Sequence, residues 1–380
     1  KTKNVITGSV AETIDPTDRI VWVHVASLGE FEQGRPIIER IRKTHPEYKI
    51  LLTFFSPSGY EIRKNYEGAD YVFYLPADTP SNARRFLDIV HPEIAIFIKY
   101  EFWINLLSEL RRRKVRSYIV SAIFRRNSVF FRPYGAMWRQ ALETFDTLFV
   151  QNVESKRLLS EIGFDNVVVA GDTRFDRVAQ IAAAAQRVET IERFRGGGRL
   201  FVAGSTWGPD EEILLPLVNA NPDVKFVIAP HEMDEGRIAH LMRDAKGGAV
   251  RYTQCDAATR FDDVQVLVLD TMGMLSSVYG SATWAYVGGG FGVGIHNTLE
   301  AATFGLPIAF GPNYGKFKEA RDMVSLGCAV SVRTAGELAA WFAPLRDDEE
   351  TLRRASRTAK DYTARNQGAT GIILRSIFNS

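Results

Sequence analysis

The sequence predicts an α/β protein made of two doubly wound parallel sheets. This prediction rests on the hydrophobic pattern and on the length of the chain. Short apolar runs alternate with helical patterns along most of the chain. Strands that read as unbroken apolar runs between helices are typical of parallel sheets covered on both faces. At 380 residues the chain is long for one hydrophobic core and sufficient for two.

The predicted strands follow these apolar runs in order, and the segments between them are predicted helices. In the first half the strands are Ile20–Ala26, Lys49–Phe54, Tyr71–Leu75, Ile94–Lys99, Arg116–Ser121, Thr147–Gln151 and Val167–Ala170. In the second half they are Leu200–Ala203, Lys225–Ala229, Val266–Leu269, Thr283–Val287, Ile308–Phe310 and Ala329–Val332.

One stretch interrupts the alternation and marks a domain boundary. It is rich in alanine, ends in Arg195-Gly-Gly-Gly-Arg199 and has no strand pattern. We therefore expect an N-terminal Rossmann-like domain over 1–178, a linker over 179–199 and a C-terminal Rossmann-like domain over 200–360. The last predicted helix, 361–380, follows helical patterns with no strand between them, and we expect it to pack back on the first domain.

The composition excludes several classes of protein. The chain has 46% hydrophobic and 24% charged residues, which are ordinary values for a soluble globular protein. Two cysteines are too few for a disulfide framework, and six scattered histidines with no metal-ligand spacing predict no metal site. The sequence has no run of about twenty apolar residues, so we expect no membrane-spanning helix in it.

The net charge of +2 gives no sign of a polyanionic partner, but basic residues gather in one window. Between Lys99 and Arg139, ten Lys or Arg residues stand against two acidic ones. Arginines alternate with aromatic residues from Arg125 to Tyr134. Two interpretations stay open, an ordinary solvated helix face and a surface for acidic lipid or membrane. Nucleic acid is disfavoured because no recognition motif accompanies the charge.

The glycine-rich segment 285–312 is the strongest functional signal. It reads as strand, glycine loop, short helix and strand, with Asn297 as the helix cap and Gly305 at the helix end. Free N–H groups at such a helix start suit a phosphate. The glycine spacing fails the dinucleotide fingerprint, and no Gly-Lys-Ser/Thr triplet marks a P-loop. His296, Asn297 and Glu300 fall where a sugar-nucleotide enzyme would hold a ribose and a phosphate.

Two glutamates follow predicted strands at their carboxyl ends, where ligands bind in open α/β sheets. Glu30 ends Ser27-Leu-Gly-Glu30 and begins a helix. It reads either as half of a capping box with Ser27 or as a carboxylate, held ionised, that accepts a proton from a sugar hydroxyl. Glu101 stands in Tyr100-Glu-Phe-Trp103 and lies near Glu30 if their strands are neighbours. Its other interpretation is the start of the next helix.

A third candidate is Arg174, in Gly171-Asp-Thr-Arg-Phe-Asp176 after another predicted strand. Its cation suits the negative charge of a leaving phosphate, whereas a salt bridge to Asp172 or Asp176 is the structural explanation. Gly204-Ser-Thr-Trp207 repeats the order of strand, polar turn and helix, and an N-cap alone explains it.

Taken together, these motifs resemble those of the Kdo transferases, which move 3-deoxy-D-manno-octulosonic acid (Kdo) from CMP-Kdo to a lipid A precursor. The likeness covers nearly the whole chain, and several motifs in one order are more specific than any one alone. They are His24-Val-Ala-Ser-Leu-Gly-Glu30, Glu101-Phe-Trp-Ile-Asn105, Gly171–Asp176, Gly204–Trp207, Asp270-Thr-Met-Gly273 and the loop and helix of Gly288–Glu300.

The resemblance implies a GT-B fold, in which two doubly wound Rossmann-like domains face each other across a cleft. It implies an acceptor-binding N-terminal domain, with Glu30 as general base and with Glu101 and Arg174 stabilising the transition state. The CMP-contacting positions of the family fall on Pro230, His231, Met272, Gly273, Met274, Asn297, Thr298, Leu299 and Glu300 in the C-terminal domain. The family usually has lysine at Arg174, so a charge is kept there. Where this chain has His231 the family usually has arginine, and where it has Met274 the family usually has glutamate, so a charged side chain is lost at each position.

The implied reaction is inverting, metal-independent glycosyl transfer without a cofactor, in lipopolysaccharide biosynthesis. The implied partners are CMP-Kdo, a lipid A precursor such as lipid IVA and the inner-membrane surface, with no nucleic acid. Acceptor or membrane contacts are expected at Arg111, Arg112, Arg113, Arg125 and Arg126. Family members usually begin with a short hydrophobic anchor that this sequence does not show. We therefore expect a peripheral or N-terminally anchored protein at the cytoplasmic face of the bacterial inner membrane.

Two other functions stay open. A sugar-nucleotide 2-epimerase shares the two-domain architecture and would bind UDP rather than CMP. A non-catalytic membrane-surface module would bind vesicles through the basic segment without binding a nucleotide. Fold analogy does not separate the three, and the ordered motifs favour the transferase.

Overall fold

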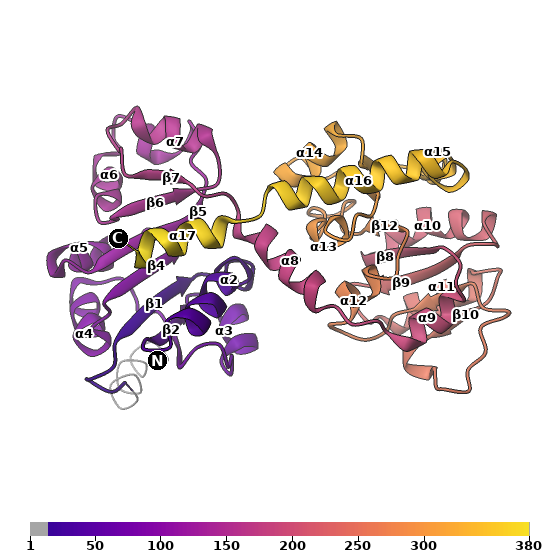
Figure 1. Ribbon diagram of the computed structural model, residues 1–380, viewed down its shortest axis with the longest axis horizontal. Coiled ribbons are helices and arrows are strands. Elements are labelled where there is room, and N and C mark those ends of the chain that lie inside the picture. The colour runs from indigo at the N-terminus through magenta and orange to yellow at the C-terminus, as the bar shows by residue number, and fades with distance from the viewer. Residues whose placement is uncertain (1–13, 380) are drawn as a thin grey trace. The chain divides into compact units, whose positions relative to one another are not determined.

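The computed structural model describes residues 14–379, and the chain divides into two compact units. The first comprises Lys1–Arg177 with Asn366–Ser380, and the second comprises Val178–Arg365. Each unit contains a seven-stranded sheet in which neighbouring strands run parallel (Figure 1). The predicted fold class of two doubly wound parallel sheets is therefore confirmed.

The sheet of the first unit has the strand order β3-β2-β1-β4-β5-β6-β7. Its strands are β1 (Ile20–Val25), β2 (Lys49–Phe54), β3 (Tyr71–Tyr74), β4 (Ile94–Ile98), β5 (Arg116–Ala122), β6 (Thr147–Val150) and β7 (Val167–Val169). Its helices are α2 (Leu28–Thr44), α3 (Pro57–Arg63), α4 (Pro80–Val90), α5 (Ile104–Arg113), η2 (Val129–Phe131), α6 (Ala136–Leu142), α7 (Val153–Ser160), the start of α8 (Thr173–Ala184) and α17 (Ala369–Phe378). The order reverses between β1 and β4, and the carboxyl ends beside such a switch point are where open α/β sheets bind ligands.

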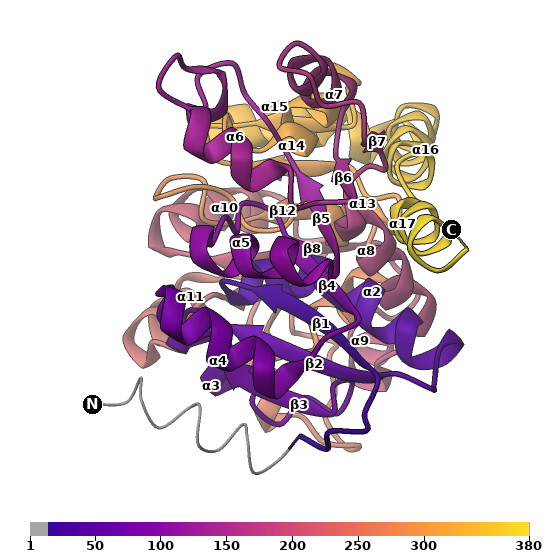
Figure 2. The ribbon, with the colours of Figure 1, turned by 90° about the vertical axis from the view of Figure 1, so that its left-hand side faces the viewer.

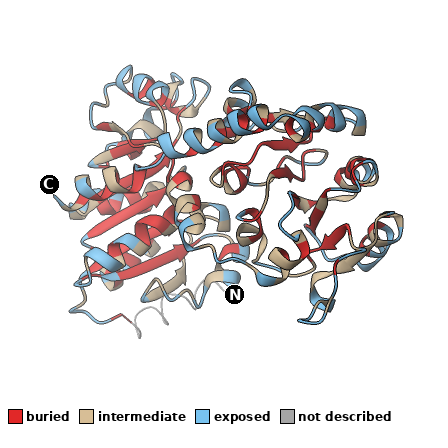
Figure 3. Cartoon of the chain, turned by 45° about the vertical axis from the view of Figure 1, so that its right-hand side comes forward, coloured by how far each residue is buried: buried red, intermediate tan, exposed pale blue. Residues whose placement is uncertain are grey.

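Helices bury both faces of this sheet (Figure 2). Side chains of α4, α5 and α6 pack on one face with Trp22 and Phe97, and those of α2 and α17 pack on the other with Val23 and Ile96. Strands β1, β2 and β4 are therefore buried along nearly their whole length (Figure 3), whereas the edge strand β3 is half-buried. Burial on both faces is why they read as unbroken apolar runs in the sequence.

Helix α17, near the end of the chain, lies in the first unit. The carboxylate of Asp176 accepts the N–H groups of Gly368 at 2.6 Å and Thr370 at 2.7 Å. Ile373 and Ile377 are buried in the same cluster as α2. A negative side chain thus stabilises the start of α17 while its apolar face covers the sheet.

The sheet of the second unit has the strand order β10-β11-β9-β8-β12-β13-β14, with a switch point between β8 and β12. Its strands are β8 (Leu200–Thr206), β9 (Lys225–Pro230), β10 (Ala249–Arg251), β11 (Val266–Val268), β12 (Trp284–Val287), β13 (Ile308–Phe310) and β14 (Ala329–Ser331). Its helices are the end of α8, α9 (Glu189–Arg195), α10 (Gly208–Ala220), α11 (Glu235–Asp244), η3 (Tyr252–Gln254), α12 (Leu275–Tyr279), α13 (Leu299–Ala302), α14 (Lys318–Ser325), α15 (Ala335–Asp347) and α16 (Glu349–Arg365).

The sequence pattern does not predict β10. It is an edge strand of three residues, each only half-buried. An edge strand pairs on one side only, so a short segment without an apolar run is enough to form it.

Candidate active site

The two predicted glutamates lie at the switch point of the first unit. Strands β1 and β4 are hydrogen-bonded neighbours. Glu30 lies in the first turn of α2, which follows β1, and Glu101 lies in the turn between β4 and α5. The charge of Glu101 is close enough to raise the pKa of Glu30. Two carboxylates from separate strands therefore share this edge of the sheet.

Glu30 is held by the backbone just before its helix. Its Oε2 accepts the N–H of Ala26 at 2.6 Å, while its own N–H lies 3.4 Å from Oγ of Ser27. The expected capping box is therefore shifted, because the carboxylate reaches Ala26 rather than Ser27. Burial raises the pKa of Glu30 and Glu101 adds to the rise, against the N–H of Ala26 and the charge of Lys99. The sequence suggested a carboxylate held ionised, but the environment instead favours proton uptake, as a general base requires.

Lys99 and Tyr100 are candidates that the sequence pattern did not reveal. Lys99 follows β4 with φ 64, a left-handed conformation that is uncommon outside glycine and clusters at functional sites. Burial raises the pKa of the Tyr100 phenol, Arg125 opposes the rise, and Glu30 and Asp172 add to it. These charges therefore gather around Tyr100. No sequence signal marks a backbone angle, which is why Lys99 was missed.

Arg174 is oriented by Asp172, as the structural explanation of this motif requires. Its Nε and Nη2 donate to Oδ2 of Asp172 at 2.9 and 2.8 Å, and its N–H donates to Oδ1 at 2.9 Å. Gln33 of α2 also donates to Oδ1 of Asp172, at 3.1 Å. The side chain of Arg174 remains 30% exposed, so an anion can approach it.

In the second unit the structure brings together the three segments predicted to contact CMP. The ring of His231, at the end of β9, stacks on that of His296 with centroids 4.3 Å apart. Ser276 of α12, next to the Met272–Met274 turn, donates to Glu300 at 2.9 Å. Met272 itself is 78% exposed. The carboxyl ends around β9, β11 and β12 therefore form one polar region beside the switch point.

The helix after the glycine loop is shorter than predicted. Helix α13 covers only Leu299–Ala302, and Thr298 rather than Asn297 precedes it. Asn297 still accepts the N–H of Leu299 at 3.1 Å, and its amide donates to Glu300 at 3.0 Å. A single turn sums few peptide dipoles, so a phosphate here would depend on individual N–H groups and side chains rather than on a helix dipole.

The glycine loop is fixed by a buried carboxylate, Asp210 of α10. Asp210 accepts the N–H groups of Gly289 and Trp207, each at 2.9 Å, and the hydroxyl of Tyr286 at 2.7 Å. Burial raises the pKa of Asp210, and these donors oppose the rise. Glycine is required beside it, because a Cβ on Gly288 would lie 2.2 Å from the carbonyl oxygen of Ser205.

Three rings form a stack next to this loop. Trp207 lies 4.8 Å from His231, and its Nε1 donates to Nε2 of His296 at 3.3 Å. Burial lowers the pKa of His296, and the neighbouring His231 lowers it further. Among residues 14–379, no three His, Cys, Asp or Glu side chains converge in a metal-binding arrangement. The two imidazoles thus present ring faces and nitrogens rather than a metal cage.

Ion pairs neutralise most of the predicted basic surface. The pairs are Arg111–Glu143, Arg112–Glu109, Arg113–Glu109, Arg113–Asp88 and Arg126–Glu161. Arg112, and then Arg113, lowers the pKa of Glu109 to about 2. Three of these carboxylates, Glu143, Asp88 and Glu161, lie outside the segment from Lys99 to Arg139. The excess of basic residues within that segment therefore overstates the positive charge of the folded surface. Arg125 lies instead near Tyr100 and the candidate site.

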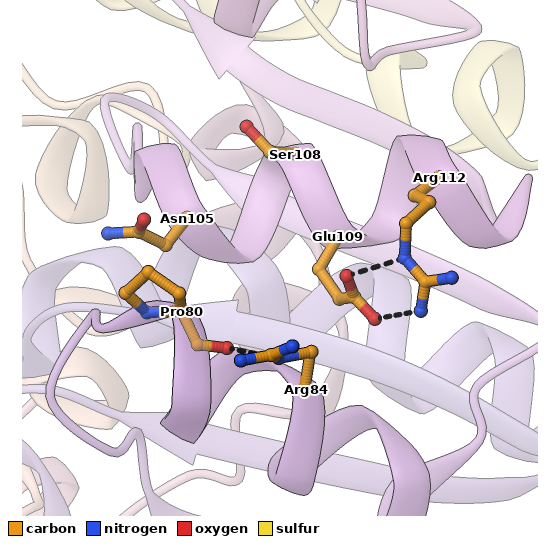
Figure 4. A pocket seen from close by; sticks show the side chains of 6 residues that line it. All are labelled: Pro80, Arg84, Asn105, Ser108, Glu109 and Arg112. Atoms are coloured by element: carbon orange, nitrogen blue, oxygen red, sulfur yellow. Dashed lines mark hydrogen bonds and ion pairs between the residues drawn. The ribbon is translucent and has the colours of Figure 1, made fainter.

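An open pocket of about 570 Å³ lies beside α5 (Figure 4). It is lined by Pro80, Arg84, Asn105, Ser108, Glu109 and Arg112. Arg112 pairs with Glu109, and Nε of Arg84 donates to the carbonyl of Pro80 at 3.2 Å. Arg112 is thus paired with a carboxylate in this pocket, whereas Arg84 donates to a neutral carbonyl.

A model of the family described as 3-deoxy-D-manno-octulosonic-acid transferase (kdotransferase) matches residues 5–177. The chain is 24% identical to the 3-deoxy-D-manno-octulosonic acid transferase of Haemophilus influenzae, over 94% of this chain and 86% of that protein. It is 27% identical to that of Bordetella pertussis over the same shares, and 26% identical to that of Aquifex aeolicus over 84% of this chain and 83% of that protein. The chain belongs to the Kdo transferase family. The family predicted from the ordered motifs is therefore confirmed.

Solved structures confirm the fold of this Kdo transferase. The UDP-GlcNAc 2-epimerase of Neisseria meningitidis aligns with a TM-score of 0.66 at 16% identity, over 95% of this chain and all of that one (100%). MurG of Acinetobacter baumannii aligns with a TM-score of 0.58 at 12% identity, over 96% and 100%. Identities this low show a shared GT-B-like fold and nothing about substrate.

Proposed function

We propose that this Kdo transferase uses CMP-Kdo as donor and a lipid A precursor as acceptor, in an inverting, metal-independent reaction that needs no cofactor. The observation that carries the proposal is Glu30, a half-buried carboxylate with a raised pKa at the switch point of the first unit. Glu30 takes the proton of an acceptor hydroxyl, whose oxygen bonds to the anomeric carbon of Kdo. The bond from that carbon to the phosphate oxygen breaks, and CMP leaves with the electron pair.

The other assigned residues stabilise charge in this proposal. Glu101 and Arg174 stabilise the transition state, and the positive charge of Arg174 stabilises the negative charge that develops on the leaving phosphate. CMP binds in the second unit, at the region that His231, His296 and Glu300 connect. Incubation with CMP-Kdo and a tetra-acylated lipid A precursor, followed by mass spectrometry of the lipid, tests the whole proposal. UDP binding without CMP binding would favour the epimerase, and vesicle binding without any nucleotide binding would favour the non-catalytic module.

Replacing Asn297 or Glu300 by alanine is expected to weaken CMP binding by about tenfold, as loss of a charge-assisted hydrogen bond does. Glu300 connects Asn297 and Ser276, so either change loosens the region. Calorimetry with CMP measures the effect. Glu337→Ala is the matched control, because Glu337 lies in the first turn of α15 in the same unit. Unchanged CMP affinity with weaker lipid binding would reverse the assignment of the two units.

The pH profile is expected to report Glu30. A base with a raised pKa loses activity on acidification at a higher pH than an ordinary glutamate. Lys99 lowers that pKa, so Lys99→Met should raise it and move the acidic limb of kcat/KM to higher pH. Lys114→Met is the control, because Lys114 is also a left-handed lysine of the first unit, with φ 56. An acidic limb that stays in place in Lys99→Met would exclude Glu30 as the titrating base.

We place the enzyme at the cytoplasmic face of the inner membrane, where its lipid acceptor would be met. In the part of the chain that the structure describes, no helix is long and apolar enough to cross a membrane. Neutralising Arg111, Arg112, Arg113, Arg125 and Arg126 together should reduce binding to anionic vesicles and its salt dependence. Each basic group contributes up to about 1 kcal/mol, and four of the five are paired, so only the combined change should be measurable.

Vesicle co-sedimentation over a salt series, beside CMP calorimetry, checks this prediction. CMP affinity should not change, because the proposed CMP site lies in the other unit. Equal sedimentation of the wild type and the variant would show that these arginines form an ordinary solvated face.

A further inference from the structure

A chain of hydrogen bonds inside the first unit ends on Glu101. Nε1 of Trp22 donates to Oγ1 of Thr53 at 2.8 Å, and that oxygen lies 2.8 Å from Nδ1 of His24. Nε2 of His24 lies 3.1 Å from Oε2 of Glu101. Trp22, Thr53 and His24 are fully buried, and the register of β1 and β2 puts His24 opposite Thr53. These contacts are therefore shielded from water and fixed by the sheet.

The donors and acceptors of this chain fit one tautomer of His24. An indole N–H only donates, so it occupies one lone pair of the Thr53 oxygen. Within residues 14–379, the other hydrogen-bond partner of that hydroxyl is Nδ1 of His24. A proton on Nδ1 would leave the buried hydroxyl hydrogen without an acceptor. The ring hydrogen therefore lies on Nε2 and points at the carboxylate of Glu101.

Aromatic side chains keep the imidazole in this orientation. Phe97 and Trp103 each lie 5.9 Å from the ring of His24, edge to face. Nε1 of Trp103 lies 2.8 Å from Oε2 of Glu101 and 3.1 Å from Nε2 of His24. With the ring hydrogen of His24 on Nε2, that nitrogen cannot accept, so the indole N–H donates to the nearer carboxylate oxygen. One carboxylate oxygen thus receives two N–H donors from rings that are packed in place. Two such donors fix the direction of a carboxylate more firmly than one.

We propose that His24 and Thr53 are positioning residues that aim Glu101 at the acceptor site through the Nε2–H tautomer of His24. This inference rests on the proposed function, in which Glu101 stabilises the transition state. A preorganised group is effective only while it keeps its direction, and a misplacement of about 1 Å can cost about a hundredfold in rate. These hydrogen bonds transfer no proton. They keep a hydrogen on Nε2 of His24, so that Nε2 always donates to Glu101.

The pair Thr53→Val and Thr53→Ser tests the hydroxyl. Valine keeps the branched shape and removes the hydroxyl, whereas serine keeps the hydroxyl. Thr53→Val should lower kcat for Kdo transfer about tenfold or more, with KM for CMP-Kdo within about twofold. Thr53→Ser should stay within about threefold of the wild-type kcat. In ¹⁵N NMR of histidine-labelled protein, the wild type and Thr53→Ser should carry the His24 hydrogen on Nε2, and Thr53→Val should lose this single tautomer.

The tautomer measurement needs no substrate, so it separates this proposal from the proposed function. A His24 hydrogen on Nδ1 in the wild type would overturn the proposal, as would an unchanged kcat in Thr53→Val. Equal losses in Thr53→Val and Thr53→Ser would also overturn it, because shape and not the hydroxyl would then matter. If Thr53→Val does not fold, His24→Gln, whose amide can still donate to Glu101, should retain more kcat than His24→Leu, and equal losses would contradict the proposal. An inactive wild type that shows the Nε2–H tautomer would defeat the proposed function and leave this geometry standing.

Discussion

Glu30→Gln is expected to reduce Kdo transfer by about a hundredfold to ten-thousandfold, the range typical of losing a positioned general base. The glutamine oxygen can still accept the N–H of Ala26, so the start of α2 should keep its shape. The variant lacks a group that can take up a proton. In the wild type, burial raises the pKa of Glu30 and so makes it a stronger base. The measurement is kcat/KM with CMP-Kdo and a tetra-acylated lipid A precursor, beside the affinity for CMP, which should not change.

The same substitution elsewhere on α2 provides the control. Glu39 forms an i,i+4 ion pair with Arg35 at 2.6 Å and lies outside the candidate site. Glu39→Gln should leave kcat/KM within about twofold, because such pairs contribute only about 0.3–0.5 kcal/mol to stability. Near-normal turnover in Glu30→Gln would reduce Glu30 to a helix-start residue and make Glu101 the next candidate base.

The positions of Glu30 and Glu101 at strand ends were predictable, because a buried parallel strand shows in the sequence where it stops. That these two strands are neighbours in the sheet was not predictable from the sequence. The pairing of β1 with β4 joins segments that are far apart in the sequence, and the local hydrophobic pattern does not specify it. From the sequence alone, Glu101 is expected near Glu30 only if the two strands are neighbours. The hydrogen bonds around His24 depend on the same pairing. The motif that contains His24 was visible, but its chemistry was not.

Other features could not be predicted because they depend on distant residues. Asp210 reads as an ordinary acid in the first turn of a helix, yet its partners Tyr286 and Gly289 lie 76 and 79 positions away. Arg111 and Arg126 belong to a basic window in the sequence, whereas in the structure they pair with carboxylates on other segments. Charge counted along a chain is therefore a poor guide to charge on a folded surface.

Asp210→Ala is expected to destabilise the second unit by about 3 kcal/mol or more, because each buried donor left without an acceptor costs about 1–3 kcal/mol. Three donors lose their partner at once, the N–H groups of Gly289 and Trp207 and the hydroxyl of Tyr286. CMP affinity should fall with stability, because the Gly289 contact fixes the glycine loop against the turn after β8. Thermal unfolding and CMP calorimetry on the same preparation measure the two effects.

Asp210→Asn separates the hydrogen bonds from the charge. An asparagine oxygen can accept both N–H groups while its amide donates to the Tyr286 oxygen, so this variant should lie much closer to the wild type in stability and in CMP affinity. Equal destabilisation by alanine and asparagine would mean that the carboxylate charge, and not its hydrogen-bond pattern, holds the loop. Loss of stability without loss of CMP affinity would show that the glycine loop keeps its shape without Asp210. The phosphate contacts would then have to be sought on the His231, Met272 and Glu300 segments instead.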